Sequence, residues 1–161
     1  MGRLAERWHA RLVAHAYRLT GERTLAADAA QDAWTDILRG LASLDDAAAF
    51  PAWAFRIVSR RCARVIRGRQ HRRAGTQAFA DDNASRPATS FDPADGSDLD
   101  RIRTAMAELP PDQRAAMGLF YLEGLHVAEI AAALDTPPGT IKTRLMHARN
   151  KLRALLQGDL P

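Results

Sequence analysis

The chain has 161 residues, of which 47% are hydrophobic and 26% are charged, and its formal net charge is +4. A chain of this length holds one ordinary domain or two small ones, each with a modest core. The first 20 residues include Arg and Glu, and no apolar run approaches the roughly 20 residues of a membrane span, so we expect a cytoplasmic protein without a signal peptide or membrane insertion. Cys62 is the only cysteine, which excludes an intramolecular disulfide and a thiolate metal cluster. We expect it to be a small buried hydrophobe, with redox sensing as the alternative.

Charge is distributed unevenly along the chain. Residues 1–78 carry 14 Arg and seven acidic residues, residues 79–100 carry one Arg and six Asp, and residues 101–161 carry eight basic and six acidic residues. Two basic ends therefore flank an acidic middle, and such ends permit a polyanionic partner.

The acidic middle lacks hydrophobic periodicity and is rich in Asp, Ser, Pro and Gly, which indicates a linker. A flexible segment of about 20 residues spans roughly 25 Å, enough for the parts on either side to occupy separated sites. Because those parts show almost no strand signal, we predict an all-α fold of two small helical domains joined by a flexible acidic linker. The predicted bounds are 1–75 for the first domain, 76–98 for the linker and 99–161 for the second domain.

Three helices are predicted in the first domain, over residues 4–19, 24–41 and 50–69. Thr20 and Gly21 end the first helix, and Thr24 is the expected N-cap of the second.

The third of these helices combines an apolar face with a cationic one, because its apolar residues and four of its arginines gather on opposite sides at helical spacing. The apolar side has Ala54, Ile57, Val58, Cys62, Val65 and Ile66, and the cationic side has Arg56, Arg60, Arg64 and Arg67. From Arg56 to Arg73 there are eight Arg and no acidic residue, a run that water or a polyanion must screen. We favour nucleic acid as the partner over an anionic membrane surface or a merely solvated face. The apolar side is needed for the core, which argues against membrane insertion.

Trp53 falls on the arginine side of the same helix. An exposed indole beside Arg suits stacking on an unpaired base, as in single-strand binders. The alternative is that Trp53 packs against the first helix.

The second domain contains a helix-turn-helix pattern. Val127, Ile130 and Leu134 lie at helical spacing, residues 135–138 break the pattern, and a second apolar stripe begins at Ile141. Pro138 suits a first helical position, and Thr136 or Thr140 is positioned to cap nearby amides. The second helix carries no acidic residue and turns hydrogen-bond donors outward, a surface suited to a major groove. The alternative is a purely structural helix pair of an all-α core.

Several short motifs in both predicted domains resemble those of a known protein family. The segments Leu109-Pro110, 121–125 (YLEGL), 129–131 (EIA), 139–145 (GTIKTRL) and Ala148-Arg149 resemble region four of the bacterial extracytoplasmic-function sigma factors. The segments 19–21 (LTG), 27–34 (ADAAQDAW) and 50–57 (FPAWAFRI) resemble region two of the same family. The resemblance covers roughly residues 10–73 and 98–156.

This resemblance implies a non-catalytic subunit that binds core RNA polymerase and directs it to promoter DNA, with an anti-sigma factor as a further expected partner. For the polymerase contact it indicates Asp28, Gln31, Asp32 and Asp36, with Trp34, Ile37 and Leu38 as core residues; the alternative is a solvated acidic face. For the minus-ten element it indicates Trp53, Arg56, Arg60, Arg64 and Arg67. For the minus-thirty-five element it indicates Thr140, Lys142, Thr143, Arg144, Met146, His147 and Arg149.

Three positions depart from the family pattern. Arg60 stands where the family often has Asn, Arg64 where it often has Asp, and Asp135 where the turn usually has Gly. The two arginines favour backbone affinity. Asp135 fits the turn because Asp tolerates a left-handed conformation better than most residues.

Catalysis is not indicated by the sequence. The five His show no metal-ligand spacing and no Gly-rich phosphate loop occurs, so we expect no catalytic site, no metal site and no cofactor. Two other functions remain as alternatives. One is a helix-turn-helix transcriptional regulator with a separate helical sensing or interaction domain, and the other is an interaction module that does not touch DNA.

Overall fold

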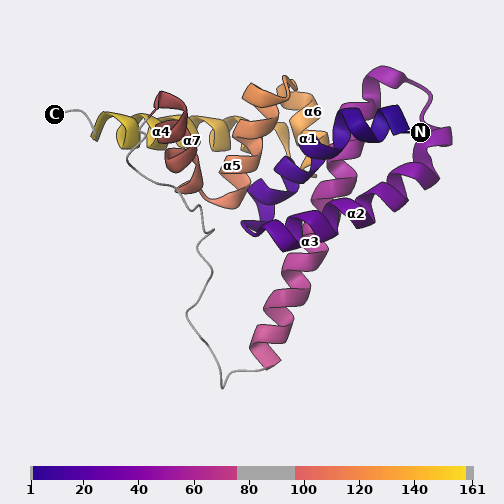
Figure 1. Cartoon of the computed structure of the whole chain (residues 1–161). Coiled ribbons are helices and arrows are strands. Elements are labelled where there is room, and N and C mark those ends of the chain that lie inside the picture. The colour runs from indigo at the N-terminus through magenta and orange to yellow at the C-terminus, as the bar shows by residue number, and fades with distance from the viewer. Residues whose placement is uncertain (1, 76–96, 159–161) are drawn as a thin grey trace.

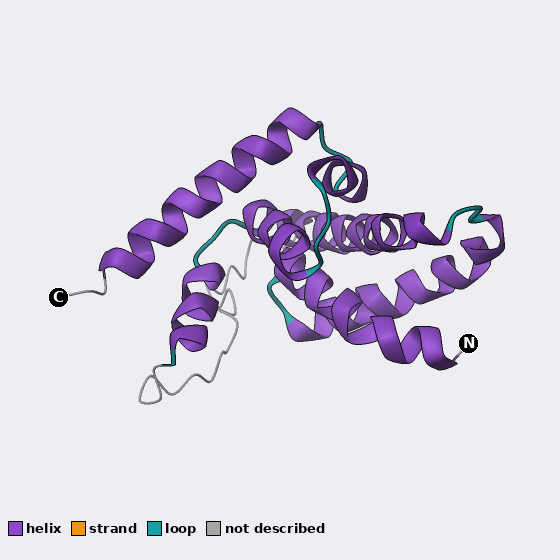
Figure 2. Cartoon of the chain, turned by 90° about the horizontal axis from the view of Figure 1, so that it is seen from above, coloured by secondary structure: helices purple, strands orange, loops and turns teal. Residues whose placement is uncertain are grey.

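The computed structural model describes residues 2–75 and 97–158, and every regular element within them is helical. Figure 1 shows the order of these elements along the chain, and Figure 2 shows from above that helices and loops account for all described residues. The predicted all-α class is therefore confirmed. The predicted linker lies outside the described residues except for its last two positions, where Ser97 caps a helix that begins at Asp98.

The first helical bundle consists of α1 (Gly2–Thr20), α2 (Arg23–Gly40) and α3 (Phe50–Gly75), with two single-turn 3₁₀ helices, Leu41–Ser43 and Ala47–Ala49, between α2 and α3. Gly21 ends α1 at a φ of 73°, where an L side chain would be strained, and its amide donates to the Tyr17 carbonyl. The predicted cap Thr24 is wrong, because α2 begins at Arg23 and its N-cap is Glu22. The third helix also extends six residues beyond the predicted Arg69.

Aromatic rings fill the centre of this bundle. Phe55 is fully buried, and its ring meets Trp8 and His15 edge-on at centroid distances of 6.1 and 5.2 Å. Small residues line the buried side of α2, which lets α1 and α3 approach it closely: Ala26, Ala29, Ala30 and Ala33.

The second bundle consists of α4 (Asp98–Ala107), α5 (Pro111–Met117), the π-helical turn η5 (Gly118–Leu122), α6 (Val127–Ala133) and α7 (Pro138–Gly158). The carboxylate of Glu129 accepts the backbone N–H of His126, which satisfies a donor at the start of α6. Ile130 and Ile141 are fully buried and hold α6 against α7.

The two bundles pack against each other through α1 with α5 and through α3 with α6. Arg114 of α5 donates to the carbonyl of Arg18 in α1 at 2.8 Å. The Arg18 side chain in turn lies on Gly118, where an added Cβ would stand 2.6 Å from the Arg18 Cδ. Gly118 is thus a position where a close approach between the bundles excludes a side chain.

A partly buried ion pair crosses this interface. Arg11 Nε donates to Glu123 Oε2 at 2.6 Å, and the Glu123 side chain is only 6% exposed. The Arg11 guanidinium also stacks on the Trp8 ring at 3.8 Å. The long α3 runs past this interface, and its C-terminal half projects away from both bundles (Figure 1).

Candidate nucleic-acid and polymerase interfaces

The helix-turn-helix has the geometry that the sequence predicts. Its second helix begins at Pro138, as expected, and Asp135 in the turn has a φ of 49°, in the left-handed region. Thr136 does not act as the expected cap. Its hydroxyl donates to the Leu134 carbonyl at 2.9 Å instead, and this bond stabilises the turn.

The outward face of α7 is exposed along its first three turns. Ile141, Leu145 and Ala148 are buried on the opposite face, so the helix cannot rotate without exposing its core side. The exposed predicted residues are Thr140, Lys142, Thr143, Met146, His147 and Arg149. These side chains form one continuous surface, which we call the recognition face.

Arg144 lies apart from the recognition face, although the sequence grouped it there. Its Nε is 3.2 Å from Asp112 Oδ2 in α5, and its Nη1 is 3.4 Å from the Thr136 hydroxyl. In this structure Arg144 therefore ties α7 to α5 and to the turn.

Arg149 is held in place by two aromatic residues that sequence reasoning did not assign. Its Nε donates to the Tyr121 hydroxyl at 2.6 Å, and its guanidinium lies 5.4 Å from the Phe120 ring centroid and 5.5 Å from that of Tyr121. Because the donor and acceptor are 28 residues apart, no local pattern indicated the contact.

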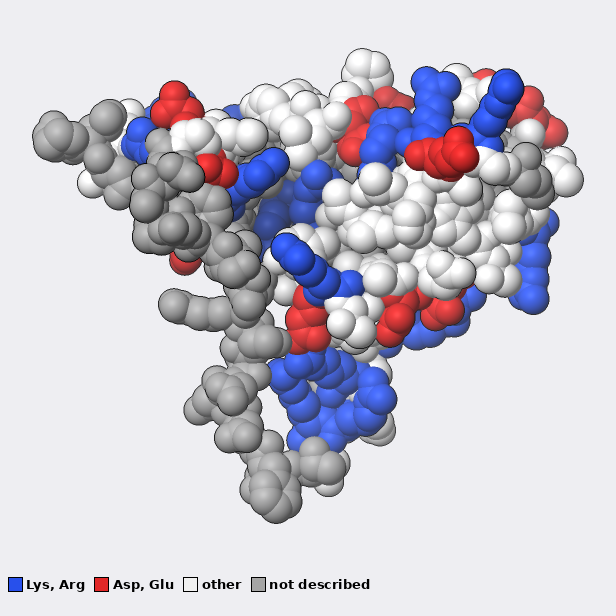
Figure 3. Space-filling view, in the orientation of Figure 1, with Lys and Arg blue, Asp and Glu red and all other residues white. Residues whose placement is uncertain are grey.

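Basic side chains cover the projecting end of α3, as the space-filling view shows (Figure 3). Arg64 and Arg67 are exposed there. Two other arginines of the helix are paired within the first bundle: Arg61 with Asp36 of α2, and Arg69 with Glu22.

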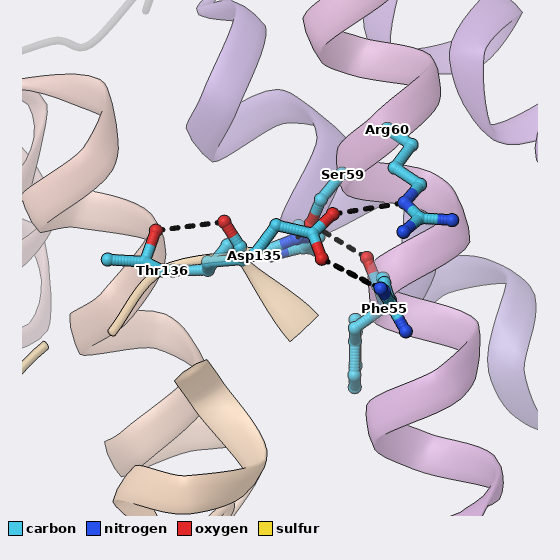
Figure 4. Close-up of polar contacts among 8 residues, drawn as sticks. Phe55, Ser59, Arg60, Asp135 and Thr136 are labelled. Atoms are coloured by element: carbon cyan, nitrogen blue, oxygen red, sulfur yellow. Dashed lines mark hydrogen bonds and ion pairs between the residues drawn. The ribbon is translucent and has the colours of Figure 1, made fainter. Parts of the chain in front are cut away.

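Arg56 and Arg60 contact the second bundle. Arg56 Nε lies 3.0 Å from Asp135 Oδ1. Arg60 Nε lies 3.0 Å from Asp135 Oδ2 (Figure 4). The hydrogen bond from Arg60, together with the charges of both arginines, lowers the pKa of the Asp135 carboxyl. The structure thus brings two predicted minus-ten residues onto the helix-turn-helix turn.

Trp53 is half-buried on the arginine side of α3. Its ring lies against the end of α2, where a Cβ added to Gly40 would be 2.8 Å from the Trp53 Cζ2. The centroids of the Trp53 and Phe50 rings are 6.0 Å apart. Trp53 thus contacts the end of α2 and Phe50, and its side chain is only partly buried.

The predicted polymerase residues divide into two groups. Asp28, Gln31 and Asp32 are exposed on α2. Asp36 is not free, because Arg61 donates to both its oxygens at 2.6 and 2.8 Å, and these hydrogen bonds lower the pKa of the Asp36 carboxyl.

Core assignments on α2 are partly correct. Ile37 is fully buried, as predicted, but Leu38 is 46% exposed, so its core assignment is wrong. Trp34 is half-buried and donates its Nε1–H to His9 Nδ1 at 3.1 Å.

Cys62 is fully buried, as predicted, and burial raises the pKa of its thiol to about 12. Such a thiol carries almost no thiolate at neutral pH, which disfavours the redox alternative. None of the helices in residues 2–75 and 97–158 is long and apolar enough to cross a membrane.

Two family models match the chain in the order that the sequence analysis expects. The model described as Sigma-70 region 2 matches residues 4–72, and that described as Sigma-70, region 4 matches residues 99–152.

Individual relatives agree with these matches. The chain is 33% identical over 153 residues to the ECF RNA polymerase sigma factor EcfG of Rhodopseudomonas palustris, covering 92% of this chain and 80% of that protein. It is 32% identical over 148 residues to the ECF RNA polymerase sigma factor SigE of Mycolicibacterium smegmatis, covering 88% of this chain but only 55% of that protein. Among solved structures, the sigma factor RpoE from Bartonella quintana, in complex with the anti-sigma factor NepR, superposes with a TM-score of 0.71 at 28% identity over 99% of this chain and 98% of that one. Because both regions match in order and a relative above 30% identity is covered over most of its length, this chain belongs to the extracytoplasmic-function sigma factors of RNA polymerase.

Proposed function

We propose that this sigma factor binds core RNA polymerase through α2, contacts the minus-ten promoter element through α3, and reads the minus-thirty-five element through the recognition face of α7. One observation carries the proposal: the chain exposes Arg64 and Arg67 on a basic helix and, on a second helix, the recognition face formed by the exposed residues among 140–149. Both surfaces suit DNA, the first through phosphate and the second through base edges. We further propose that the protein is cytoplasmic, has no catalytic activity, and uses no cofactor.

Transcription in vitro tests this function directly. Purified core polymerase with this chain should produce run-off transcripts from a subset of genomic fragments that core polymerase alone does not transcribe. A helix-turn-helix regulator with a sensing domain would instead alter transcription only when another sigma factor is present. Run-off reactions with and without a housekeeping sigma factor separate these two functions.

Anti-sigma binding is proposed from the relatives. The Bartonella quintana structure is a complex with an anti-sigma factor, and CnrH, which superposes with a TM-score of 0.64 at 25% identity over 99% of this chain and 88% of that one, is in complex with the cytosolic domain of CnrY. We propose that this chain is held inactive by a protein of the same kind.

The acidic face of α2 provides the first prediction. Reversing Asp28 and Asp32 to Lys should weaken binding to core polymerase on the order of tenfold, because both exposed carboxylates are proposed to meet basic groups on the polymerase. Fluorescence anisotropy of labelled protein titrated with core polymerase measures this affinity. The matched control reverses Glu6 and Asp45, which are also exposed, and should bind normally. If the two double variants bind core polymerase with equal affinity, the acidic face of α2 is not the polymerase contact.

Promoter opening provides the second prediction. Trp53→Ala should slow strand separation more than it weakens closed-complex binding, by roughly 1–3 kcal/mol for a lost base stack. Permanganate footprinting reports the melted bases, and a mobility shift reports the closed complex. Because Trp53 also packs on Gly40, unfolding of the variant must be measured alongside, and Trp53→Tyr, which keeps an aromatic face, should restore melting. Normal melting in Trp53→Ala would leave this residue with a packing role only.

A further inference from the structure

The turn of the helix-turn-helix and the basic helix of the first bundle are joined by an acidic residue. Asp135 forms ion pairs with both Arg56 and Arg60. Figure 4 shows the Asp135 and Arg60 side chains pointing toward each other across the interface. We propose that Asp135 is an internal competitor of DNA: its carboxylate occupies the two arginines that the minus-ten strand needs, and so favours a closed arrangement of the two bundles. This inference rests on the minus-ten role proposed for α3.

Chemical similarity between the two ligands supports the competition. A carboxylate and a phosphate both present oxygen acceptors to the planar guanidinium fork. In Arg56, Nε and Nη2 both lie 3.0 Å from Asp135 Oδ1, so the edge that would bind a phosphate is already used. Arg60 uses its Nε on the second oxygen, at 3.0 Å. Phosphate can bind in the same way only after the carboxylate leaves.

Backbone geometry fixes the competing carboxylate. Asp135 adopts a left-handed conformation at a φ of 49°, within a turn held by the bond from the Thr136 amide to the Ala131 carbonyl at 3.0 Å. Arg60 and Asp135, two of the three positions at which the sequence departs from the family that it resembles, therefore meet in space.

Solvent exposure sets the expected size of the effect. The side chains of Arg56, Arg60 and Asp135 are 43%, 59% and 43% exposed, and ion pairs of this kind shift an equilibrium by only a few-fold each. The apparent affinity for DNA is the intrinsic affinity multiplied by the fraction of molecules in which Arg56 and Arg60 are free to bind it. Removing both pairs should therefore tighten DNA binding about three- to tenfold.

Two readouts test the proposal on the full chain. The first is affinity for a fluorescein-labelled, mixed-sequence single-stranded DNA of about 12 nucleotides, at fixed salt. The second is energy transfer between dyes on Ala27→Cys and Ala154→Cys, both at exposed positions in different bundles, while Cys62 is buried and resists labelling. Asp135→Asn is compared with Asp98→Asn, which removes the same charge from an exposed site in α4.

Asp135→Asn should bind the DNA about three- to tenfold more tightly than wild type and show lower energy transfer, whereas Asp98→Asn should match wild type in both. In an Arg56→Ala, Arg60→Ala background, Asp135→Asn should change affinity by less than about twofold, because its partners are gone. Tighter binding that persists in this background would reduce Asp135 to a general charge effect and overturn the proposal. Unchanged energy transfer in Asp135→Asn would overturn it as well. If no variant binds DNA at all, the minus-ten function fails, while the energy-transfer result still reports on the closed arrangement.

Discussion

Acidification from pH 7 to pH 5 is expected to lower the free energy of unfolding by about 2 kcal/mol, and His15 is expected to account for most of this loss. His15 is fully buried in α1, and burial, followed by the nearby Arg18 charge, lowers the pKa of its imidazole from 6.5 to about 3. The folded protein therefore keeps this ring neutral in a pH range where the unfolded chain protonates it.

Hydrogen bonding explains why the neutral ring fits its site. The Ser59 hydroxyl donates to the Phe55 carbonyl at 2.7 Å, so its oxygen is left to accept from His15 Nε2, 2.8 Å away. Nδ1 then carries no proton and has no hydrogen-bond partner among the described residues. A second proton, placed on Nδ1, would be a buried donor and charge without an acceptor.

The direction of the pH effect follows from the two pKa values. Well above pH 6.5 the ring is neutral in both states and His15 contributes no pH dependence. As the pH falls below 6.5, the unfolded state takes up a proton that the folded state refuses until about pH 3, so stability decreases through this window. The carboxyls of Asp36 and Asp135, whose pKa values are lowered, add their own loss only below the unfolded pKa of 3.8. Measurements at pH 5 and above therefore exclude most of the contribution of these two carboxyls.

Urea unfolding at pH 7, 6 and 5 checks this prediction. His15→Phe keeps a ring against Phe55 but cannot titrate, so its unfolding free energy should vary with pH much less than that of wild type, whatever its absolute stability. His147→Gln, at an exposed position of α7, should keep the wild-type pH dependence. A His15→Phe variant that loses as much stability on acidification as wild type would show that another group is responsible.

Most helix positions could be predicted from local sequence patterns, because a helix is stabilised by interactions between residues only a few positions apart. The start of α7 at Pro138 and the left-handed Asp135 followed from properties of single residues, and buried Cys62 followed from periodicity. The burial of Ile37 followed from the family resemblance. The resemblance failed at Leu38, because a position in a motif does not determine how far the neighbouring helices reach over that side chain.

Contacts between the bundles could not be predicted from the sequence. Arg11 and Glu123 are 112 residues apart, and Arg56 and Asp135 are 79 apart. The charge pattern of α3 indicated an anionic partner, and the structure supplies one from within the same chain. For the same reason, Arg144 was grouped with the recognition face although its partner is Asp112.

On the recognition face, Lys142→Ala or His147→Ala is expected to weaken binding to the preferred minus-thirty-five duplex by about 1–3 kcal/mol, with little effect on a scrambled duplex. Both side chains are exposed near the N-terminal half of α7, which is where a helix-turn-helix reaches base edges. Thr143 and Met146 lie between them on the same exposed surface, so a groove that accommodates one of these residues brings the others to the bases.

Arg149 should behave differently from the other residues of the recognition face, because Tyr121 and Phe120 hold its guanidinium, which we propose contacts phosphate. Arg149→Ala should weaken binding to the specific and scrambled duplexes alike and lower the salt slope by about one unit. Tyr121→Phe removes only the 2.6 Å hydrogen bond that orients Arg149, so it should produce a smaller loss of the same kind. Affinities for both duplexes at several salt concentrations separate the two behaviours. If the Lys142 and His147 variants lose as much on the scrambled duplex as on the specific one, these residues contribute charge rather than sequence recognition, because a base contact cannot survive scrambling of the bases.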